Sequence, residues 1–228
     1  MPIQIAIDGP AGAGKGTTAA AIAEKLHLLY LDTGAMYRAV GLFALRNGIS
    51  TGDEAALEEM LKHLSLDVTA DPKGIVRVYI QGEDVTHLIR SQEVSMAASD
   101  VSRWPSVRHD MVSRQREIAG SRDVILEGRD IGTDVLPDAT VKIFLTASPE
   151  ERAKRRTLQL ASKGEDVAYE DVLAQILIRD KQDMGRAASP LRPAEGSVII
   201  DSTDLSETQV VDKILGIIKQ MNVFAGRE

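Results

Sequence analysis

The first 26 residues contain the arrangement that most limits how this chain can fold. Apolar residues at Ile3, Ile5 and Ile7 are typical of a buried strand, and the alanine-rich stretch 18–26 is typical of a helix. A glycine-rich segment joins the two: Gly9, Pro10, Ala11, Gly12, Ala13, Gly14, Lys15, Gly16 and Thr17. Glycine lets the backbone adopt positive φ and approach a ligand closely, and the N–H groups that begin a helix point at a bound anion. Because Lys15 adds a mobile positive charge, the segment predicts a phosphate-binding site.

The spacing of Gly9, Gly14 and Lys15 matches the P-loop pattern, but Gly16 stands where serine or threonine is usual. The hydroxyl comes one residue later, at Thr17, which is the candidate ligand for Mg²⁺. The predicted ATP-phosphate site is the whole segment from Gly9 to Thr17 together with Thr18. A turn that binds nothing could contain the same glycines, yet the flanking strand and helix favour a nucleoside phosphate.

Composition excludes several classes of protein. The chain has 228 residues, enough for one domain with inserted segments, and no cysteine, which excludes disulfides and thiolate metal sites. Its four histidines show no metal-ligand spacing, and its formal net charge of −7 argues against general affinity for nucleic acids or membranes. No stretch approaches the about 18 uncharged apolar residues of a membrane span, and no export signal precedes the first strand. We therefore expect a cytoplasmic protein with no nucleic-acid or membrane partner, acting as a monomer, although nothing in the sequence bears directly on oligomeric state.

Apolar periodicity predicts the order of the elements. Short apolar runs predict strands at 28–31, 124–126, 141–145 and 198–200. Helical spacing predicts helices at 35–47, 54–64, 91–102 and 105–119, and later helices that begin after Ser148, near Glu170 and after Ser206. Alternation at 66–68 and 76–80, with a turn at 71–74, predicts a small antiparallel sheet. Repeated strand-then-helix units predict an α/β fold in which helices cover both faces of a parallel sheet.

Polar residues follow two of these predicted strands. Glu127, Arg129 and Asp130 come after the strand at 124–126, and ligands of open α/β sheets bind beyond the carboxyl ends of the strands. Tyr37 and Arg38 fall in the first turn of a helix, where an arginine opposes the helix dipole and so indicates an anionic partner. A strand-end turn or a solvated arginine would fit the same pattern.

Two later helices carry arginine-rich faces. Arg152, Arg155 and Arg156 have the spacing of one helix face. In the next helix the predicted packing side is Val172, Leu173, Ile176 and Leu177. Farther along the same helix, the spacing i, i+4 and i+7 puts three charged residues on one face: Arg179, Asp183 and Arg186. The face thus changes from apolar to charged, which is typical of a helix that extends from the core into a cleft. A solvated run of charges remains the alternative.

Four motifs in this order resemble the bacterial-type cytidylate kinases, one of the nucleoside monophosphate kinase families. They are residues 7–17, residues 31–38, residues 128–133, and Arg179-Asp180 with Asp183 and Arg186. The resemblance covers nearly the whole chain. It implies a three-layer P-loop kinase core at 1–33, 121–150 and 193–228, a monophosphate-binding lobe at 34–120 with an inserted sheet at about 65–90, and a helical lid at 151–192.

The resemblance also implies roles for residues. Those implied for the cytosine edge are Ser99, Arg108 and Asp130. Those implied for the acceptor phosphate are Arg38, Arg129 and Arg186. Those implied for the sugar are Arg179 and Asp183, and Thr33 and Tyr37 complete the implied CMP site. Thr33 departs from the serine of many relatives but keeps the hydroxyl. Arg155 and its neighbours resemble the lid arginines that close over ATP, and the implied catalytic set is Lys15, Arg129, Arg186 and Arg155.

The implied reaction is Mg²⁺-assisted in-line transfer of the γ-phosphoryl group of ATP to CMP or dCMP, in which positioning and charge neutralisation supply the catalysis. The acidic partner of the Mg²⁺ stays open between Glu127 and Asp130. Two other functions also stay open. The acceptor could be UMP, AMP or a non-nucleotide, or the chain could be a P-loop switch, although it lacks the Asn-Lys-x-Asp guanine signature.

Overall fold

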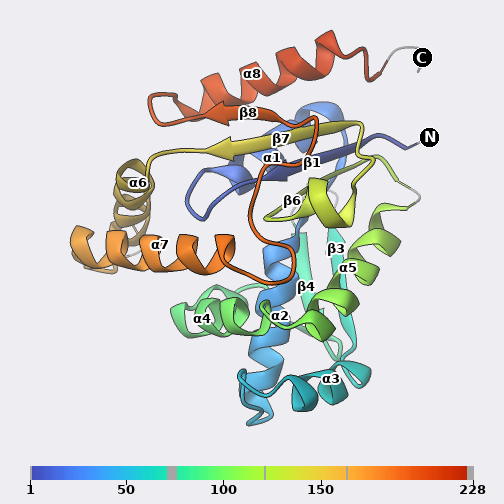
Figure 1. Ribbon diagram of the computed structural model, residues 1–228, viewed down its shortest axis with the longest axis vertical. Coiled ribbons are helices and arrows are strands. Elements are labelled where there is room, and N and C mark those ends of the chain that lie inside the picture. The colour runs from blue at the N-terminus through green and yellow to red at the C-terminus, as the bar shows by residue number, and fades with distance from the viewer. Residues whose placement is uncertain (1, 71–75, 121, 163, 225–228) are drawn as a thin grey trace.

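A five-stranded parallel sheet lies at the centre of the computed structural model, which describes residues 2–70, 76–120, 122–162 and 164–224 (Figure 1). The strand order is β2 (Leu29–Asp32), β6 (Val124–Gly128), β1 (Gln4–Asp8), β7 (Val141–Thr146) and β8 (Val198–Asp201). All neighbouring strands in this sheet run parallel, so their carboxyl ends meet at one edge. Every predicted core strand is confirmed, and the α/β class with it.

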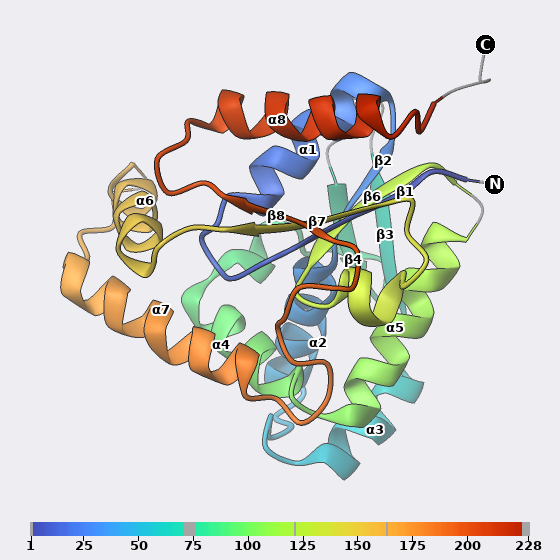
Figure 2. The ribbon, with the colours of Figure 1, turned by 45° about the horizontal axis from the view of Figure 1, so that its top comes forward.

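Side chains alternate between the two faces of this sheet. Ile5 and Ile125 pack with α1 (Lys15–Leu26) and α8 (Glu207–Gln220), whereas Ala6 and Leu126 pack with α2 (Thr33–Arg46) and α5 (Pro105–Ala119). Figures 1 and 2 show the two helical layers on opposite sides of the strands. Burial on both faces explains why these strands read as nearly continuous apolar runs rather than as alternating ones.

Local capping sets where the helices begin. The side chain of Asp32 accepts the N–H of Ala35 at 3.0 Å, so α2 begins at Thr33, two residues before its predicted start. The predicted caps are confirmed at Ser148, which accepts the N–H of Glu151, and at Ser206, which forms a capping box with Gln209.

The inserted segment adds a second, antiparallel sheet beside α2. It contains α3 (Glu54–Lys62), β3 (Leu66–Ala70), β4 (Val76–Ile80), β5 (Glu83–Asp84), the short 3₁₀ turn Leu88–Arg90 and α4 (Gln92–Val101). Val68 lies opposite Val78, as period-two spacing predicts, and the predicted turn at 71–74 lies outside the described residues. The two-residue strand β5 was not predicted, because its residues, Glu83 and Asp84, carry no apolar signal.

Two helices form a hairpin at one side of the sheet: α6 (Pro149–Ala161) and α7 (Tyr169–Met184) (Figure 1). They share a small apolar cluster of Ala153, Leu160, Val172 and Ile176. Leu177 does not belong to the packing side as predicted, because it is 49% exposed. The buried stripe of α7 instead runs through Ile176 to Asp180 and Asp183, and Leu177 lies about 100° away around the helix.

The structure also contains a π-helical turn, Ile131–Val135, between β6 and β7, which was not predicted. Across the described ranges, no helix combines the length and the apolar character needed to span a membrane.

A close contact between α2 and α4 generates a stability prediction. A Cβ on Gly41 would lie 2.9 Å from the backbone nitrogen of Ala98, so Gly41→Ala must push the two helices apart. We expect it to lower the free energy of unfolding by about 1–3 kcal/mol in urea denaturation. Gly216→Ala in α8 is the matched control, since its added methyl group would meet no atom of another element within 4 Å. That change should stabilise by about 0.5–1 kcal/mol, and equal effects of the two substitutions would contradict the packing argument.

Candidate active site

The glycine-rich segment forms a tight loop between β1 and α1. Gly12 and Gly14 adopt φ of 79° and 89°, and a Cβ on Gly9 would lie 1.9 Å from the carbonyl oxygen of Leu145. The loop therefore passes directly against β7, where only glycine fits. Gly14 is the N-cap of α1 and caps it with no side-chain hydrogen bond, which leaves the first N–H groups of the helix to face an anion. Thr17 is exposed in this first turn, whereas Thr18 is buried.

Lys15 lies under this loop and is only 5% exposed. Its Nζ donates a hydrogen bond to the carbonyl oxygen of Pro10 at 2.8 Å. Burial, followed by repulsion from Arg129, lowers the pKa of Lys15 to about 7, and the carboxylate of Glu127 opposes this shift. A lysine held close to neutral is ready to gain a proton when a phosphate group approaches it.

Four arginines interact electrostatically in one cluster: Arg38 from α2, Arg129 after β6, Arg179 from α7 and Arg186 just beyond α7. Arg129 and Arg179 also act on Lys15. Asp183, which is 1% exposed, accepts a hydrogen bond from Arg129 Nε at 2.8 Å and another from Arg186 at 2.5 Å. Burial and repulsion from Arg129, Arg38 and Arg186 lower the pKa of Arg179 to about 10. Positive charges packed this closely in a buried place indicate an anion-binding site.

Several buried donors of this cluster have no hydrogen-bond partner among the described residues: Nε of Arg38, Nε of Arg108, Nε of Arg179 and the hydroxyl of Tyr37. Buried polar groups are nearly always paired, because an unmade hydrogen bond costs about 1–3 kcal/mol. The orphaned groups therefore fit a polar, anionic ligand that approaches from this side.

One end of the cluster combines acidic and basic groups. The buried side chains of Arg108 and Asp130 form an ion pair, and the guanidinium of Arg108 lies over the ring of Tyr37 at 5.6 Å. Burial raises the pKa of Asp130 against the opposing charge of Arg108. Ser99, at the end of α4, donates to Gln182 of α7 at 3.3 Å. Arg108, Asp130 and Tyr37 thus place a guanidinium, a carboxylate and an unpartnered hydroxyl at this end, while the Ser99 hydroxyl is paired with α7.

Thr33, predicted for the same site, is buried and donates its hydroxyl proton to the carbonyl oxygen of Glu127 at 2.7 Å. It thereby holds the start of α2 against the end of β6.

A second group of oxygen atoms lies beside Gly16. A Cβ there would lie 3.0 Å from Glu127 Oε1 and 3.4 Å from the hydroxyl of Tyr30, which donates to the same carboxylate at 3.1 Å. Burial and then the charge of Asp32 raise the pKa of Glu127, while Lys15 opposes the shift. A side chain at position 16 would crowd this carboxylate and push it back by a few tenths of an ångström, which favours glycine in place of the usual hydroxyl residue.

Arg152, which shares a predicted helix face with Arg155, lies at this site. It is buried and donates to the carbonyl oxygen of Ala11 at 3.0 Å and to both carboxylate oxygens of Asp180, at 3.0 and 2.5 Å. The predicted residue Arg155 instead donates to the carbonyl oxygen of Ser202 at 2.6 Å and to Glu151 at 3.0 Å. Both arginines lie on α6, and only their tertiary partners distinguish them. Arg152 thus joins the helical hairpin to the phosphate loop.

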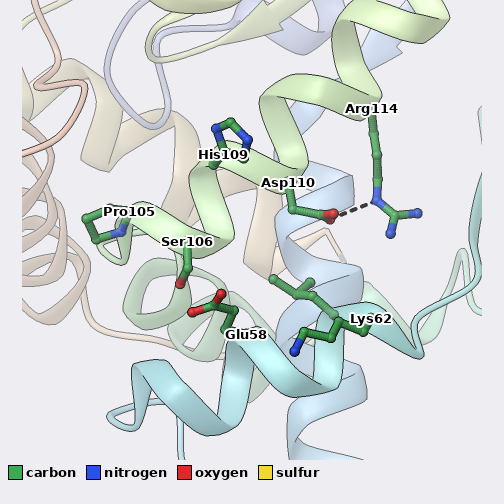
Figure 3. Close-up of a pocket in the computed structure, with 8 residues that line it drawn as sticks. Glu58, Lys62, Pro105, Ser106, His109, Asp110 and Arg114 are labelled. Atoms are coloured by element: carbon green, nitrogen blue, oxygen red, sulfur yellow. Dashed lines mark hydrogen bonds and ion pairs between the residues drawn. The ribbon is translucent and has the colours of Figure 1, made fainter.

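A cavity of about 570 Å³ lies elsewhere, between α3 and α5 (Figure 3). Glu58, Lys62, Ser106 and His109 line it, together with Asp110 and Arg114, which pair with each other at 2.8 Å. None of the unpartnered groups named above lies on its wall. The arginine cluster, and not this cavity, is therefore the candidate active site.

Both the sequence and the fold of this chain are similar to those of known proteins. The sequence profile of the family described as Cytidylate kinase matches residues 5–220. The Cytidylate kinase of Caldicellulosiruptor bescii is 52% identical over 213 residues, which are 93% of this chain and 94% of the relative. That of Bacillus licheniformis is 49% identical over 214 residues, 94% of this chain and 95% of the relative. A solved gluconokinase from Sinorhizobium meliloti 1021, 15% identical, has a TM-score of 0.50 over 100% of this chain and 98% of its own, a likeness of fold alone.

The pKa of Lys15 generates a prediction about proton uptake. At pH 8, about one unit above the pKa of about 7, most Lys15 side chains are neutral, and bound phosphates restore the charge. We expect ADP binding at pH 8 to take up a proton and to weaken as the pH rises above 7. Calorimetric titrations in two buffers of different ionisation enthalpy measure the uptake, and Lys15→Met should abolish this part of it. Enthalpies that do not depend on the buffer would contradict the prediction.

Proposed function

The chain belongs to the cytidylate kinase family, and on this premise we propose that it transfers the γ-phosphoryl group of ATP to CMP or dCMP, giving ADP and CDP or dCDP. The observation that carries the proposal is the electrostatic interaction between the two halves of the site. The charges of Arg129 and Arg179, from the arginine cluster, act directly on Lys15 of the phosphate loop. A donor held by the loop and an acceptor held by the arginines would therefore be close enough for direct transfer.

Charge neutralisation is the main contribution that this site can make to the reaction. Donor and acceptor are both polyanions, and the acceptor phosphate is largely ionised at neutral pH, so no strong general base is needed. We propose that Lys15, Arg129 and Arg186 neutralise the oxygens of the transferred group. Arg155 belongs to the same proposal as a lid residue that closes over ATP and excludes water.

We propose that three groups of residues in the cluster bind the three parts of CMP. Arg38, Arg129 and Arg186 bind the phosphate of CMP, and Arg179 and Asp183 bind the sugar. Ser99, Arg108 and Asp130 bind the cytosine edge, with Thr33 and Tyr37 as further contacts. A carboxylate opposite the exocyclic amine accepts a hydrogen bond from cytosine. Uracil would place an oxygen against the carboxylate, and two acceptors that face each other would weaken the binding of UMP.

The oxygen atoms beside Gly16 fit Mg²⁺, which takes hard oxygen ligands and retains several waters. Of the two carboxylates considered, Glu127 is the better partner, because it lies against Gly16 and is influenced by Lys15, while Asp130 is paired with Arg108. We propose that Glu127 and the exposed hydroxyl of Thr17 hold the ion, mostly through water. When bound, it would neutralise charge on the ATP phosphates.

The division of the chain into a core, a monophosphate-binding lobe at 34–120 and a lid at 151–192 belongs to the same proposal. The shared apolar cluster of α6 and α7, separate from those of the main sheet, supports the lid as a unit of its own. We further propose that the protein acts as a monomer on nucleotides of the cytoplasm.

An ADP-release assay over CMP, dCMP, UMP and AMP tests the proposed acceptor. We expect kcat/KM for CMP to exceed that for UMP by about tenfold or more, as for a site whose polar groups pair with one base only. Asp130→Asn should narrow this ratio, since the amide can donate to the oxygen of uracil. Asp110→Asn, on the outer part of α5, is the control and should leave the ratio unchanged. Equal rates on CMP and UMP would contradict the role of Asp130, and tight nucleotide binding without transfer would indicate a switch.

The sugar contact gives a separate prediction. If the Asp183 carboxylate meets the sugar hydroxyls, Asp183→Asn should lower kcat/KM for CMP more than for dCMP, by on the order of tenfold, and so narrow their difference. Steady-state kinetics with both acceptors measure it, with Asp171→Asn in the exposed first turn of α7 as control. An unaltered CMP to dCMP ratio would mean that the sugar is recognised elsewhere.

A further inference from the structure

Asp8 is a buried acid at the junction between the sheet and the phosphate loop. It is the last residue of β1, directly before Gly9, and is 3% exposed. Its Oδ1 accepts the backbone N–H of Ile131 and its Oδ2 accepts that of Gly132, each at 2.7 Å. One carboxylate thus binds two successive N–H groups that lie more than 120 residues farther along the chain.

These two N–H groups begin the π-helical turn that follows Arg129 and Asp130. The pairing of β1 with β6 ends where Asp8 lies opposite Gly128, so strand pairing with β1 does not extend to Arg129 and Asp130. They lie between the last paired residue and the N–H groups held by Asp8. The carboxylate therefore fixes the far end of the segment that carries both side chains.

The position of this charge is unfavourable in itself. Burial raises the pKa of Asp8 to about 7, although the N–H groups of Gly132 and Ile131 oppose the shift. Of the charged groups around it, Asp130 in the turn raises the pKa and Lys15 on α1 lowers it. From β7, the aliphatic chain of Lys142 lies near Gly132. Burying a carboxylate to pair two amides is unfavourable. Stability therefore does not account for Asp8, whereas its position between the two segments does.

We propose that Asp8 is a positioning residue, which joins the strand that enters the phosphate loop to the turn directly after Arg129 and Asp130. This contact thereby fixes the position of the acceptor site relative to the donor site at the carboxyl edge of the sheet. This inference rests on the proposed acceptor roles of Arg129 and Asp130, and it adds a residue that itself touches neither nucleotide.

Asp8→Asn tests the proposal, because the amide keeps the shape but turns an N–H₂ group toward one of the two backbone N–H groups. We expect kcat/KM for CMP to fall by about tenfold or more, with a raised KM, and the preference for CMP over UMP to narrow. The Kd for ADP should change by less than about twofold, since the loop is held separately by the packing of Gly9 on β7.

Asp123→Asn is the matched control. Asp123 accepts the N–H of Ile3 at 2.7 Å, so it also joins the region of β1 to that of β6, but at the opposite, amino ends of the strands. This variant should keep kcat, KM and the CMP to UMP ratio within about twofold. Equal losses in both variants would mean that Asp8 serves general stability, which would overturn the proposal.

A measurement on the unaltered protein covers the case in which Asp8→Asn does not fold. NMR titration should show the carboxyl carbon of Asp8 and the amide protons of Ile131 and Gly132 changing together, with one shared midpoint near 7. Amide shifts that do not follow the carboxyl group would overturn the proposal.

Arg129→Ala separates this inference from the proposed function. If Arg129→Ala abolishes transfer to CMP while Asp8→Asn behaves as the unaltered protein, the positioning role alone fails. If Arg129→Ala leaves transfer to CMP unchanged, the acceptor site and the positioning role both fail.

Discussion

The concentration of guanidinium groups around Asp183 is the constraint on which the arrangement of the molecule depends. Asp183 accepts hydrogen bonds from Arg129 and Arg186, and Asp32 pairs with Arg38 at 2.6 Å. These carboxylates offset repulsion between side chains that belong to α2, α7 and the end of β6. Because removing one partner from a buried charge network is strongly unfavourable, the network holds α7 over the sheet edge. The same ion pairs that stabilise this arrangement place the positive charges where two polyanions would meet.

The sequence could predict whatever depends on neighbouring residues. Apolar runs predicted the core strands, Ser148 and Ser206 predicted helix starts, and the spacing of Arg179 and Asp183 predicted one stripe of α7. Arg186 does not continue this stripe as predicted, because α7 ends at Met184, but it pairs with Asp183 from just beyond the helix. The sequence could not predict contacts between distant segments. The hydrogen bonds from Ile131 and Gly132 to Asp8 span more than 120 residues. Arg152 and Arg155 lie on the same face of one helix, but they bind to different distant segments. Leu177 shows the same limit, since a helix that is partly covered leaves apolar residues exposed.

The hairpin of α6 and α7 has an apolar cluster of its own, yet a hydrogen bond joins it to the phosphate loop. Among the described residues, its four buried apolar residues pack with each other and with no residue of the main sheet, so this cluster joins α6 to α7 without joining them to the core. The bidentate pair of Arg152 and Asp180 joins the two helices, and a further hydrogen bond from Arg152 reaches the carbonyl oxygen of Ala11 in the phosphate loop. A change in the conformation of this loop therefore acts directly on the residue that holds the hairpin together.

Two buried acids, Asp8 and Asp183, make the free energy of unfolding depend on pH in opposite directions. The pKa of Asp8, raised from 3.8 to about 7, means that the folded protein retains a proton which the unfolded chain releases. Stability from this group is therefore greatest below pH of about 4 and is lost as the pH rises to about 7, a cost on the order of 4 kcal/mol. Burial acts to raise the pKa of Asp183, but Arg129 and Arg186 bring it below 3.8, so its contribution is present at neutral pH and is lost in acid. At neutral pH the ion pairs of Asp183 therefore stabilise the fold, whereas the buried charge of Asp8 destabilises it. The retention of Asp8 in spite of this cost follows from the geometry that phosphoryl transfer needs and not from stability.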